Sequence, residues 1–270
     1  IIYSLVSGGT SIAALFMAGY IPGILWGLAC MAVAFMIAAR RGYRSKQKVS
    51  MKLALKVFWQ ALPSLLLIVI VIGGILKGVF TATEGSVVAV VYSLILSVFF
   101  YRSIKWKDLP KILLESAEMT GIIVFLIGVS SIMSWVMAFT GIPAAVSSFL
   151  LSISSNKYVI LLLMNILLLL VGTFMDLTPA ILIFTPIFLP ICQNFGMDPV
   201  HFGIMLVLNL CIGNITPPVG NTLFIGVKIA KTKIEEVIRP LLPFYGAILV
   251  VLLFVTYIPQ LSLWLPSIVK

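Results

Sequence analysis

The chain alternates long uncharged segments with short charged ones, and this pattern predicts its secondary structure. Eight stretches contain no Asp, Glu, Lys or Arg: 11–39, 57–76, 85–101, 119–156, 158–175, 177–197, 199–227 and 240–269. A helix needs about 20 apolar residues to cross a hydrocarbon core ~30 Å thick, and most of these stretches are near or above that length. The pattern therefore predicts seven or eight membrane-crossing α-helices.

Charged residues and prolines indicate where several of these spans begin and end. The predicted spans outside the central region are 11–39, 57–76 with an amphipathic start at 51–59, 84–101, about 112–140, and 243–265. Pro63 is expected to kink the second of them. The segment 142–154 is too short to cross and rich in Ser, so it is expected to lie along the membrane interface.

The region between Lys157 and Asp198 carries one charge, Asp176, in forty residues. Two full spans with Asp176 in a surface turn would explain this pattern. A re-entrant hairpin whose tip, GTFMDLTP (172–179), stops inside the membrane would explain it equally well. Both arrangements return the chain to the same side, so the positions of the basic loops do not separate them. Three prolines in the second arm predict a broken rather than an ideal helix.

A helix with a well-marked start follows. Asp198 is expected at the N-cap and Pro199 at the first helical position, and the helix is predicted to run to Gly213. The sequence GNITPPVGN (213–221) then contains two consecutive prolines, which exclude a regular helix because neither donates a backbone hydrogen bond. Helix is expected to resume from Val219 to about Lys228.

Composition and charge support a polytopic all-α membrane protein. The 270 residues are 61% hydrophobic and 10% charged, with a mean hydropathy of +1.21, far from the composition of a soluble domain. The net charge of +10 does not indicate nucleic-acid binding, because 15 of the 18 Lys and Arg fall in the windows 40–56, 102–111 and 228–239. These alternate loops are expected to be cytoplasmic under the positive-inside rule.

The chain offers little for covalent chemistry. It has one His and no protease, nucleotide-binding or dinucleotide-binding motif, so an enzyme is not expected. His201 is interpreted as a solvated residue at the membrane interface, with proton sensing as the alternative. Cys30, Cys192 and Cys211 are isolated in apolar surroundings and are interpreted as small core residues.

Two features indicate a binding site instead. A carboxylate at membrane depth costs at least ~2.5–3.5 kcal/mol unless it is compensated, so Asp176 is a functional candidate; capping of the next arm is the alternative. The break at 213–218 frees carbonyls that lipid cannot satisfy, which is typical of a cavity or an ion site; a Pro kink used for packing is the alternative. Nearby hydroxyls and amides would complete the coordination: Thr173, Thr178, Asn209, Asn214, Thr216, Asn221 and Thr222.

At these motifs the sequence resembles the large membrane subunit of tripartite ATP-independent periplasmic (TRAP) transporters. The resemblance rests on GTFMDLTPAILIFTPIFLPI (172–191), GMDPVHFGIMLVLNLCIGNITPPVGNTLF (196–224), RPLLPF (239–244) and PQLSLWLP (259–266), and on residues 1–25 at the front. It implies that the chain is the C-terminal part of this subunit, in an elevator-type transporter built from inverted repeats. The first hairpin and the first Pro-Pro break would lie upstream of Ile1.

The resemblance also implies a function. The family couples sodium entry to the import of organic acids, here expected to be sialic acid or a C4-dicarboxylate, and needs no cofactor beyond the coupling ion. Its partners are a small four-helix membrane subunit, fused or separate, and a soluble periplasmic binding protein, in the bacterial inner membrane. The sodium ligands, largely backbone carbonyls, would be Gly172, Asp176, Gly213, Thr216 and Val219. The substrate ligands would be Thr173, Thr178, Asn214 and Asn221.

The same resemblance divides the chain into functional segments. Residues 1–49 would be the tail of the first repeat, with one transmembrane helix of the transport domain and a basic loop, and 50–141 scaffold helices. Residues 142–155 would form an interfacial arm, 156–195 the re-entrant hairpin, 196–230 the broken helix, and 231–270 a cytoplasmic connector and the last span. Two other functions stay open: a stand-alone sodium/divalent-anion symporter, or a channel or structural subunit.

Overall fold

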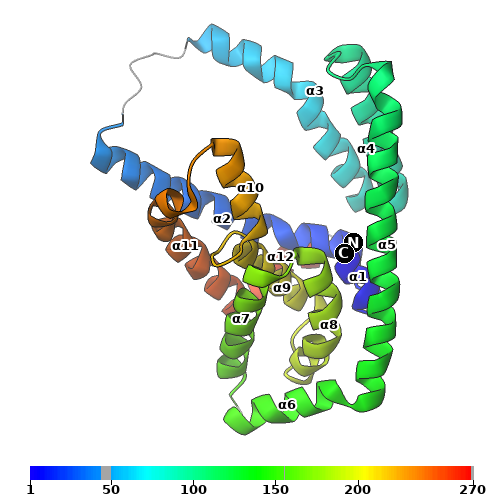
Figure 1. Cartoon of the computed structure of the whole chain (residues 1–270), viewed down its shortest axis with the longest axis vertical. Coiled ribbons are helices and arrows are strands. Elements are labelled where there is room, and N and C mark those ends of the chain that lie inside the picture. The colour runs from blue at the N-terminus through cyan, green and yellow to red at the C-terminus, as the bar shows by residue number, and fades with distance from the viewer. Residues whose placement is uncertain (44–49, 155, 269–270) are drawn as a thin grey trace. The chain divides into compact units, whose positions relative to one another are not determined.

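The structure is a computed structural model that describes residues 1–43, 50–154 and 156–268 (Figure 1). Every regular element within these ranges is a helix. Seven of the described helices are long and apolar enough to cross a membrane. The prediction of an all-α polytopic membrane protein is therefore confirmed. Part of the first basic loop, at 44–49, lies outside the described residues.

The chain folds as two compact units, one made of Ile1–Arg41 with Leu126–Lys270 and the other of Gly42–Phe125. The second unit contains the helices α3 (Met51–Leu76) and α4 (Ala82–Ile95), the π-helical turn η1 (Leu96–Phe100), the 3₁₀ turn η2 (Trp106–Asp108), and the first part of α5 (Leu109–Thr140). Helix α3 packs against α4 and has no buried side chain.

Local polar contacts stabilise the start of α4 and surround the proline inside α3. Thr81 and Glu84 form a capping box at the start of α4, with the Thr81 backbone N–H donating to Glu84 Oε2 at 2.7 Å. Helix α3 continues through Pro63, whose carbonyl accepts a 2.8 Å hydrogen bond from the Tyr92 hydroxyl.

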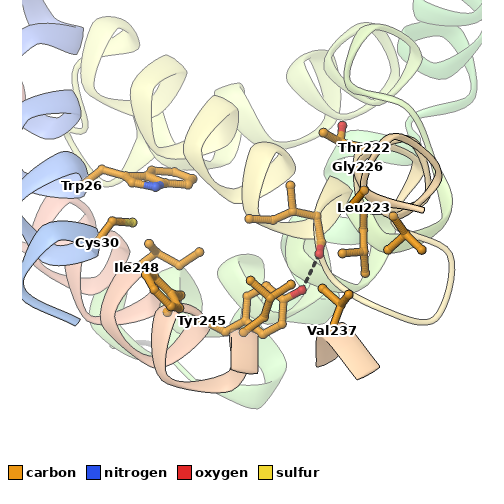
Figure 2. A pocket seen from close by; sticks show the side chains of 13 residues that line it. Trp26, Cys30, Thr222, Leu223, Gly226, Val237, Tyr245 and Ile248 are labelled. Carbon is orange, nitrogen blue, oxygen red and sulfur yellow. Dashed lines mark hydrogen bonds between the residues drawn. The ribbon is translucent and has the colours of Figure 1, made fainter. Parts of the chain in front are cut away.

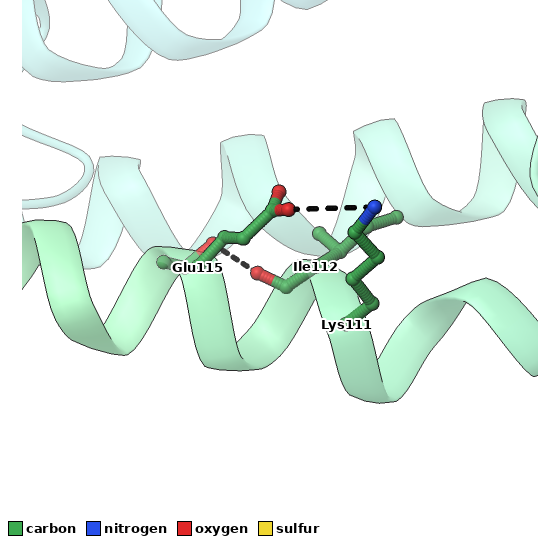
Figure 3. A network of polar contacts seen from close by, with 4 residues as sticks. Lys111, Ile112 and Glu115 are labelled. Atoms are coloured by element: carbon green, nitrogen blue, oxygen red, sulfur yellow. Dashed lines mark hydrogen bonds and ion pairs between the residues drawn. The ribbon is translucent and has the colours of Figure 1, made fainter.

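The start of α5 carries an exposed polar network (Figure 3). Lys111 Nζ lies 3.8 Å from Glu115 Oε1, one helical turn away, with the side chains 80% and 64% exposed. Beside this pair, the Ser116 hydroxyl donates to the Ile112 carbonyl at 2.7 Å. Exposed pairs of this kind contribute little to stability, so they mark the polar end of a span rather than a functional site.

The first unit holds the other helices and most of the buried residues. Its helices are α1 (Ile2–Val6), α2 (Ile12–Arg41), α6 (Ile142–Ile153), α7 (Lys157–Phe174), α8 (Leu177–Asn194), α9 (Pro199–Asn214), α10 (Asn221–Ala230), α11 (Ile234–Tyr257) and α12 (Gln260–Ile268). Helices α7 and α8 form a helical hairpin, and both arms pack against α9 (Figure 1). The main core lies between these three helices and α1.

The broken helix follows its predicted signals closely. Asp198 caps α9, with its Oδ1 accepting from the Val200 N–H at 2.7 Å, and Pro199 is the first helical residue. Helix α9 ends at Asn214, one residue beyond the prediction. Helix α10 starts at Asn221 rather than at Val219, because Gly220 adopts a left-handed conformation with φ +57°. The peptide bond between the two prolines of the break is cis.

The last predicted span is present, but its predicted bounds, 243–265, are wrong. The span is α11, which begins at Ile234 and runs through Pro240 and Pro243 to Tyr257, and α12 is a separate helix. Membrane helices tolerate proline where neighbouring groups compensate the lost hydrogen bond. The helix stops before Pro259, because the residue preceding a proline is disfavoured in helical geometry; Ile258 has φ −116° and ψ 87°.

The interpretation of His201 as a solvated residue is also wrong. Its side chain is 3% exposed, and Nε2 lies 2.7 Å from the Val255 carbonyl of α11. The first turn of α9 is covered by α1, where the Tyr3 ring packs on Gly203 and the Tyr3 hydroxyl donates to the Pro199 carbonyl at 2.6 Å. His201 itself lies against α11 and borders a cavity with Tyr158 of α7 and Leu263 of α12, and the sequence of α9 alone does not reveal these neighbours.

We expect His201→Ala to lower the free energy of unfolding by about 2–4 kcal/mol, because it leaves a cavity and deprives the Val255 carbonyl of its partner. The measurement is the thermal unfolding midpoint of the full-length protein in detergent. Ser267→Ala is the control, since this exposed hydroxyl bonds only locally to the Trp264 carbonyl. Equal midpoints for the two variants would contradict a buried, hydrogen-bonded His201.

Candidate functional site

The tip of the α7–α8 hairpin meets the break of the α9–α10 helix at two glycines. A Cβ atom added to Gly213 would lie 2.6 Å from the Cα and the carbonyl carbon of Gly172. A Cβ added to Gly172 would lie 3.0 Å from Gly213 Cα. The two backbones are therefore in direct contact, and any side chain at Gly213 would force them apart.

A backbone hydrogen bond joins the tip to the break beyond this contact. The Gly220 N–H donates to the Thr173 carbonyl at 3.0 Å, which satisfies an acceptor that the end of α7 leaves without an intrahelical partner. The left-handed Gly220 lies so close to the Thr216 carbonyl that an added Cβ would be 2.9 Å from its oxygen. The hairpin tip and the helix break, the two parts of the site predicted from the sequence, therefore lie together.

Asp176 and Asn214 extend the contact with side chains. Asn214 Nδ2 lies 3.5 Å from Asp176 Oδ1, a long hydrogen bond between the tip and the break. Asp176 is at the N-cap of α8 but its exposed side chain makes no capping bond, so the simple capping explanation for this residue is not realised. Asn214 Oδ1 is buried and has no hydrogen-bond partner in the described structure. The pair thus leaves oxygen atoms with unused acceptor capacity.

Four helix ends converge here. Helices α7 and α9 end at the contact, and α8 and α10 begin at it. The C-terminal ends present carbonyl groups with partial negative charge, and the N-terminal ends present N–H groups with partial positive charge. An arrangement of this kind suits a cation and an anion bound side by side.

The hydroxyls of two predicted ligands are directed back into their own helices. Thr173 is 7% exposed and its hydroxyl donates to the Leu170 carbonyl at 2.7 Å. The Thr216 hydroxyl donates to the Ile212 carbonyl at 2.6 Å, and the Thr216 N–H donates to the Gly213 carbonyl at 2.8 Å. These hydroxyl protons are therefore already used, which leaves oxygen lone pairs as the groups that a ligand would meet.

The other predicted ligands lie at the same helix ends. Thr178 is half-buried in the first turn of α8, and Val219 is half-buried in the break directly before Gly220. Asn221 begins α10, but its side chain lies outside the described part of the structure. The assignment of all these residues to sodium or substrate stays a prediction.

Tyr245 is a contributor to the break that the sequence analysis missed. Its hydroxyl donates to the Ile215 carbonyl at 2.6 Å, satisfying an acceptor freed where α9 ends (Figure 2). Tyr245 also lines a cavity of about 350 Å³ together with Trp26 and Cys30 of α2 and Leu223 of α10. A tyrosine within an apolar span is the signal available in the sequence, because a buried phenol hydroxyl needs a partner.

Comparison with known proteins agrees with this architecture. The family model described as the DctM component of tripartite ATP-independent periplasmic transporters matches residues 1–261. An uncharacterised protein of Salmonella typhimurium, YgiK, is 54% identical over 267 residues, 99% of this chain and 61% of that protein.

Two relatives with named substrates are similar over the same region. The C4-dicarboxylate TRAP transporter large permease DctM of Pseudomonas aeruginosa is 40% identical, over 96% of this chain and 60% of the relative. The sialic acid TRAP transporter large permease SiaM of Vibrio cholerae is 37% identical, over 99% of this chain and 62% of the relative. The chain therefore spans about three fifths of the length of these relatives.

The described helices define a polytopic helical membrane protein, and two of its relatives are named as large permease proteins, which are not enzymes. The chain belongs to the DctM component family of the tripartite ATP-independent periplasmic transporters. The family resemblance seen in the sequence is thereby confirmed. Sialic acid is the substrate named for one relative, and other relatives are named for other substrates.

We expect Gly213→Ala to destabilise the protein by about 1–3 kcal/mol, because its Cβ overlaps the Gly172 backbone, which cannot rotate away. Gly246→Ala in α11 is the matched control: its Cβ would meet nothing within 4 Å. That control should be neutral or up to about 1 kcal/mol stabilising, from helix propensity. Thermal unfolding in detergent compares the two, and an equally mild effect at Gly213 would contradict the close backbone contact.

Proposed function

We propose that the chain forms part of the large membrane subunit of a sodium-coupled transporter that imports an organic anion. The observation that carries the proposal is the meeting of the hairpin tip and the helix break through Gly172–Gly213 and Thr173–Gly220. Discontinuous helices whose ends face one another are typical of substrate and ion sites in secondary transporters. Membership of the TRAP family supports the same function.

The donor set at this site fits sodium. Asp176 supplies a carboxylate, Asn214 a buried amide oxygen without a hydrogen-bond partner, and the ends of α7 and α9 supply carbonyls. These are all oxygen atoms, the ligands that hard cations take. Gly172, Gly213, Thr216 and Val219 are the proposed backbone ligands. A bound sodium ion would supply positive charge beside the substrate and would satisfy the Asn214 oxygen.

The N-terminal ends of α8 and α10 are the proposed contacts for the substrate. Because the Asp176 side chain does not cap α8, the first N–H groups of that helix are not used by it and can donate to an anion. Thr178, Asn214 and Asn221 are the proposed side-chain donors to the substrate. Thr173 would join them once its hydroxyl released the Leu170 carbonyl. The substrates named for two relatives are C4-dicarboxylate and sialic acid, which share a carboxylate group. We therefore propose a carboxylate substrate.

The geometry supports a re-entrant hairpin rather than two full spans. The 16 residues of α9 measure about 24 Å, so the break falls within a crossing that continues through α10 towards its basic end at Lys228. The hairpin tip is bonded to this break and therefore shares its depth. A tip inside the bilayer would place the Asp176 carboxylate at the depth of the helix break rather than at the membrane surface.

The same proposal covers how the site moves and which partner proteins it works with. The hairpin, the broken helix, α2 and α11 lie in one compact unit, whose two clusters of buried residues both include α9, and this suits an elevator movement of that unit as a block. In the complete transporter, a small four-helix membrane subunit would accompany the large one. A soluble periplasmic protein would deliver the substrate to it at the bacterial inner membrane.

The test compares thermal unfolding of the full-length protein in sodium and in potassium at equal ionic strength. A sodium site at ten times its dissociation constant stabilises the folded state by about 1.4 kcal/mol. We expect this stabilisation, and sodium-dependent uptake, to be lost in Asp176→Ala.

Asp198→Ala is the matched control, because Asp198 also stands at a helix N-cap but lies at the opposite end of α9. The lost cap should lower the free energy of unfolding by about 1 kcal/mol, and hence the midpoint, in both salts. The stabilisation by sodium should be kept. If the wild type responded equally to sodium and potassium, the sodium-coupled function would be wrong, and a channel or structural role would be favoured.

A further inference from the structure

A buried polar cluster lies in the same unit as the proposed site but makes no contact with the hairpin tip. It consists of Asn165 of α7, Asn209 of α9 and Thr256 of α11, which are 2%, 0% and 1% exposed. Its surroundings are apolar, with Met164, Leu168, Leu206 and Leu210 buried on either side along the two helices that carry the asparagines. Polar side chains in such a position need a reason, because leaving them unpaired is costly.

The cluster forms a directed chain of hydrogen bonds across three helices. Asn209 Nδ2 donates to Asn165 Oδ1 and to the Met205 carbonyl, the latter at 3.0 Å. Asn165 Nδ2 in turn lies 3.2 Å from Thr256 Oγ1, whose proton goes to the Leu252 carbonyl at 2.8 Å. Asn209 Oδ1 is the atom of this chain that has no partner in the described structure.

The cluster and the glycine contact belong to one helix–helix seam. Leu169 is one helical turn beyond Asn165, and Gly213 is one turn beyond Asn209. At that next turn the two backbones touch, since a Cβ on Gly213 would lie 2.9 Å from the Leu169 carbonyl oxygen. The asparagine pair is therefore one turn below the contact that brings tip and break together.

We infer that Asn165 and Asn209, oriented by Thr256, are positioning residues that set the register of α7 against α9 and thereby hold the hairpin tip on the helix break. Leucine and methionine contacts along this seam are not directional, so they allow small rotations and slides of one helix along the other. An amide pair permits one register only, as a single buried asparagine does in coiled coils. The functional consequence rests on the proposed sodium site.

The variant Asn165→Leu/Asn209→Leu tests this role in the full-length protein. Replacing both partners of a buried hydrogen-bonded pair with apolar side chains of similar shape can be nearly neutral for stability, so we expect an unfolding midpoint near the wild type. Without a fixed register, we expect the sodium concentration for half-maximal stabilisation to rise at least tenfold. We also expect at least tenfold faster hydrogen exchange at the Gly220 amide, whose bond to Thr173 joins tip and break.

Two further variants complete the design. Thr185→Val is the control: like Thr256→Val it removes a buried hydroxyl, but one in α8, away from the seam and without a hydrogen-bond partner in the described structure, and it should change neither readout. Thr256→Val keeps the asparagine pair but frees Asn165 from α11. It should weaken sodium binding and speed Gly220 exchange about threefold, and it provides the test if the double variant does not fold.

The two readouts separate the inference from the proposed function. Wild-type sodium affinity and wild-type Gly220 exchange in a folded double variant would overturn the register role and leave the sodium site intact. If the double variant did not fold, wild-type sodium affinity and wild-type Gly220 exchange in Thr256→Val would overturn the register role instead. If sodium has no effect on the wild type, the proposed function fails, and the exchange rate at Gly220 still decides whether the asparagines set the register.

Discussion

The contact between Gly172 and Gly213 is the constraint on which the rest of the site depends. Two helices with any side chain at Gly213 could not approach so closely, since an added Cβ would overlap the Gly172 backbone at 2.6 Å. This approach lets the Gly220 N–H reach the Thr173 carbonyl and places Asn214 beside Asp176. One backbone contact therefore determines where the hairpin tip lies and which polar groups face one another.

The membrane explains why this contact is surrounded by so many specific partners. Helix ends leave carbonyl and N–H groups that lipid cannot satisfy, so each needs a partner within the protein or from a ligand. Tyr245 satisfies the Ile215 carbonyl, Gly220 satisfies that of Thr173, and the break itself uses the Gly213 carbonyl. The Asn214 side-chain oxygen is buried without a partner, and this orphaned acceptor gives the tip and break their proposed affinity for a cation.

Much of the secondary structure could be predicted because its signals are local. Asp198 and Pro199 mark the start of α9, and the two adjacent prolines mark its break, since these residues act through their own backbone geometry. The beginning of α11 at Ile234 could not be predicted in this way. Its prolines resemble helix stops in sequence, and only the packed neighbours show that the helix continues through them.

The sequence by itself determined that this is a polytopic helical membrane protein of the TRAP family, because hydrophobic length and proline-rich motifs are properties of contiguous residues. Only the tertiary structure decided that Asp176 and Asn214, 38 residues apart, lie together, and that His201 is buried against α11. It also revealed that Asn165, Asn209 and Thr256 form one cluster. Such contacts join helices distant in the chain, and local propensities carry no information about which faces of two helices will meet.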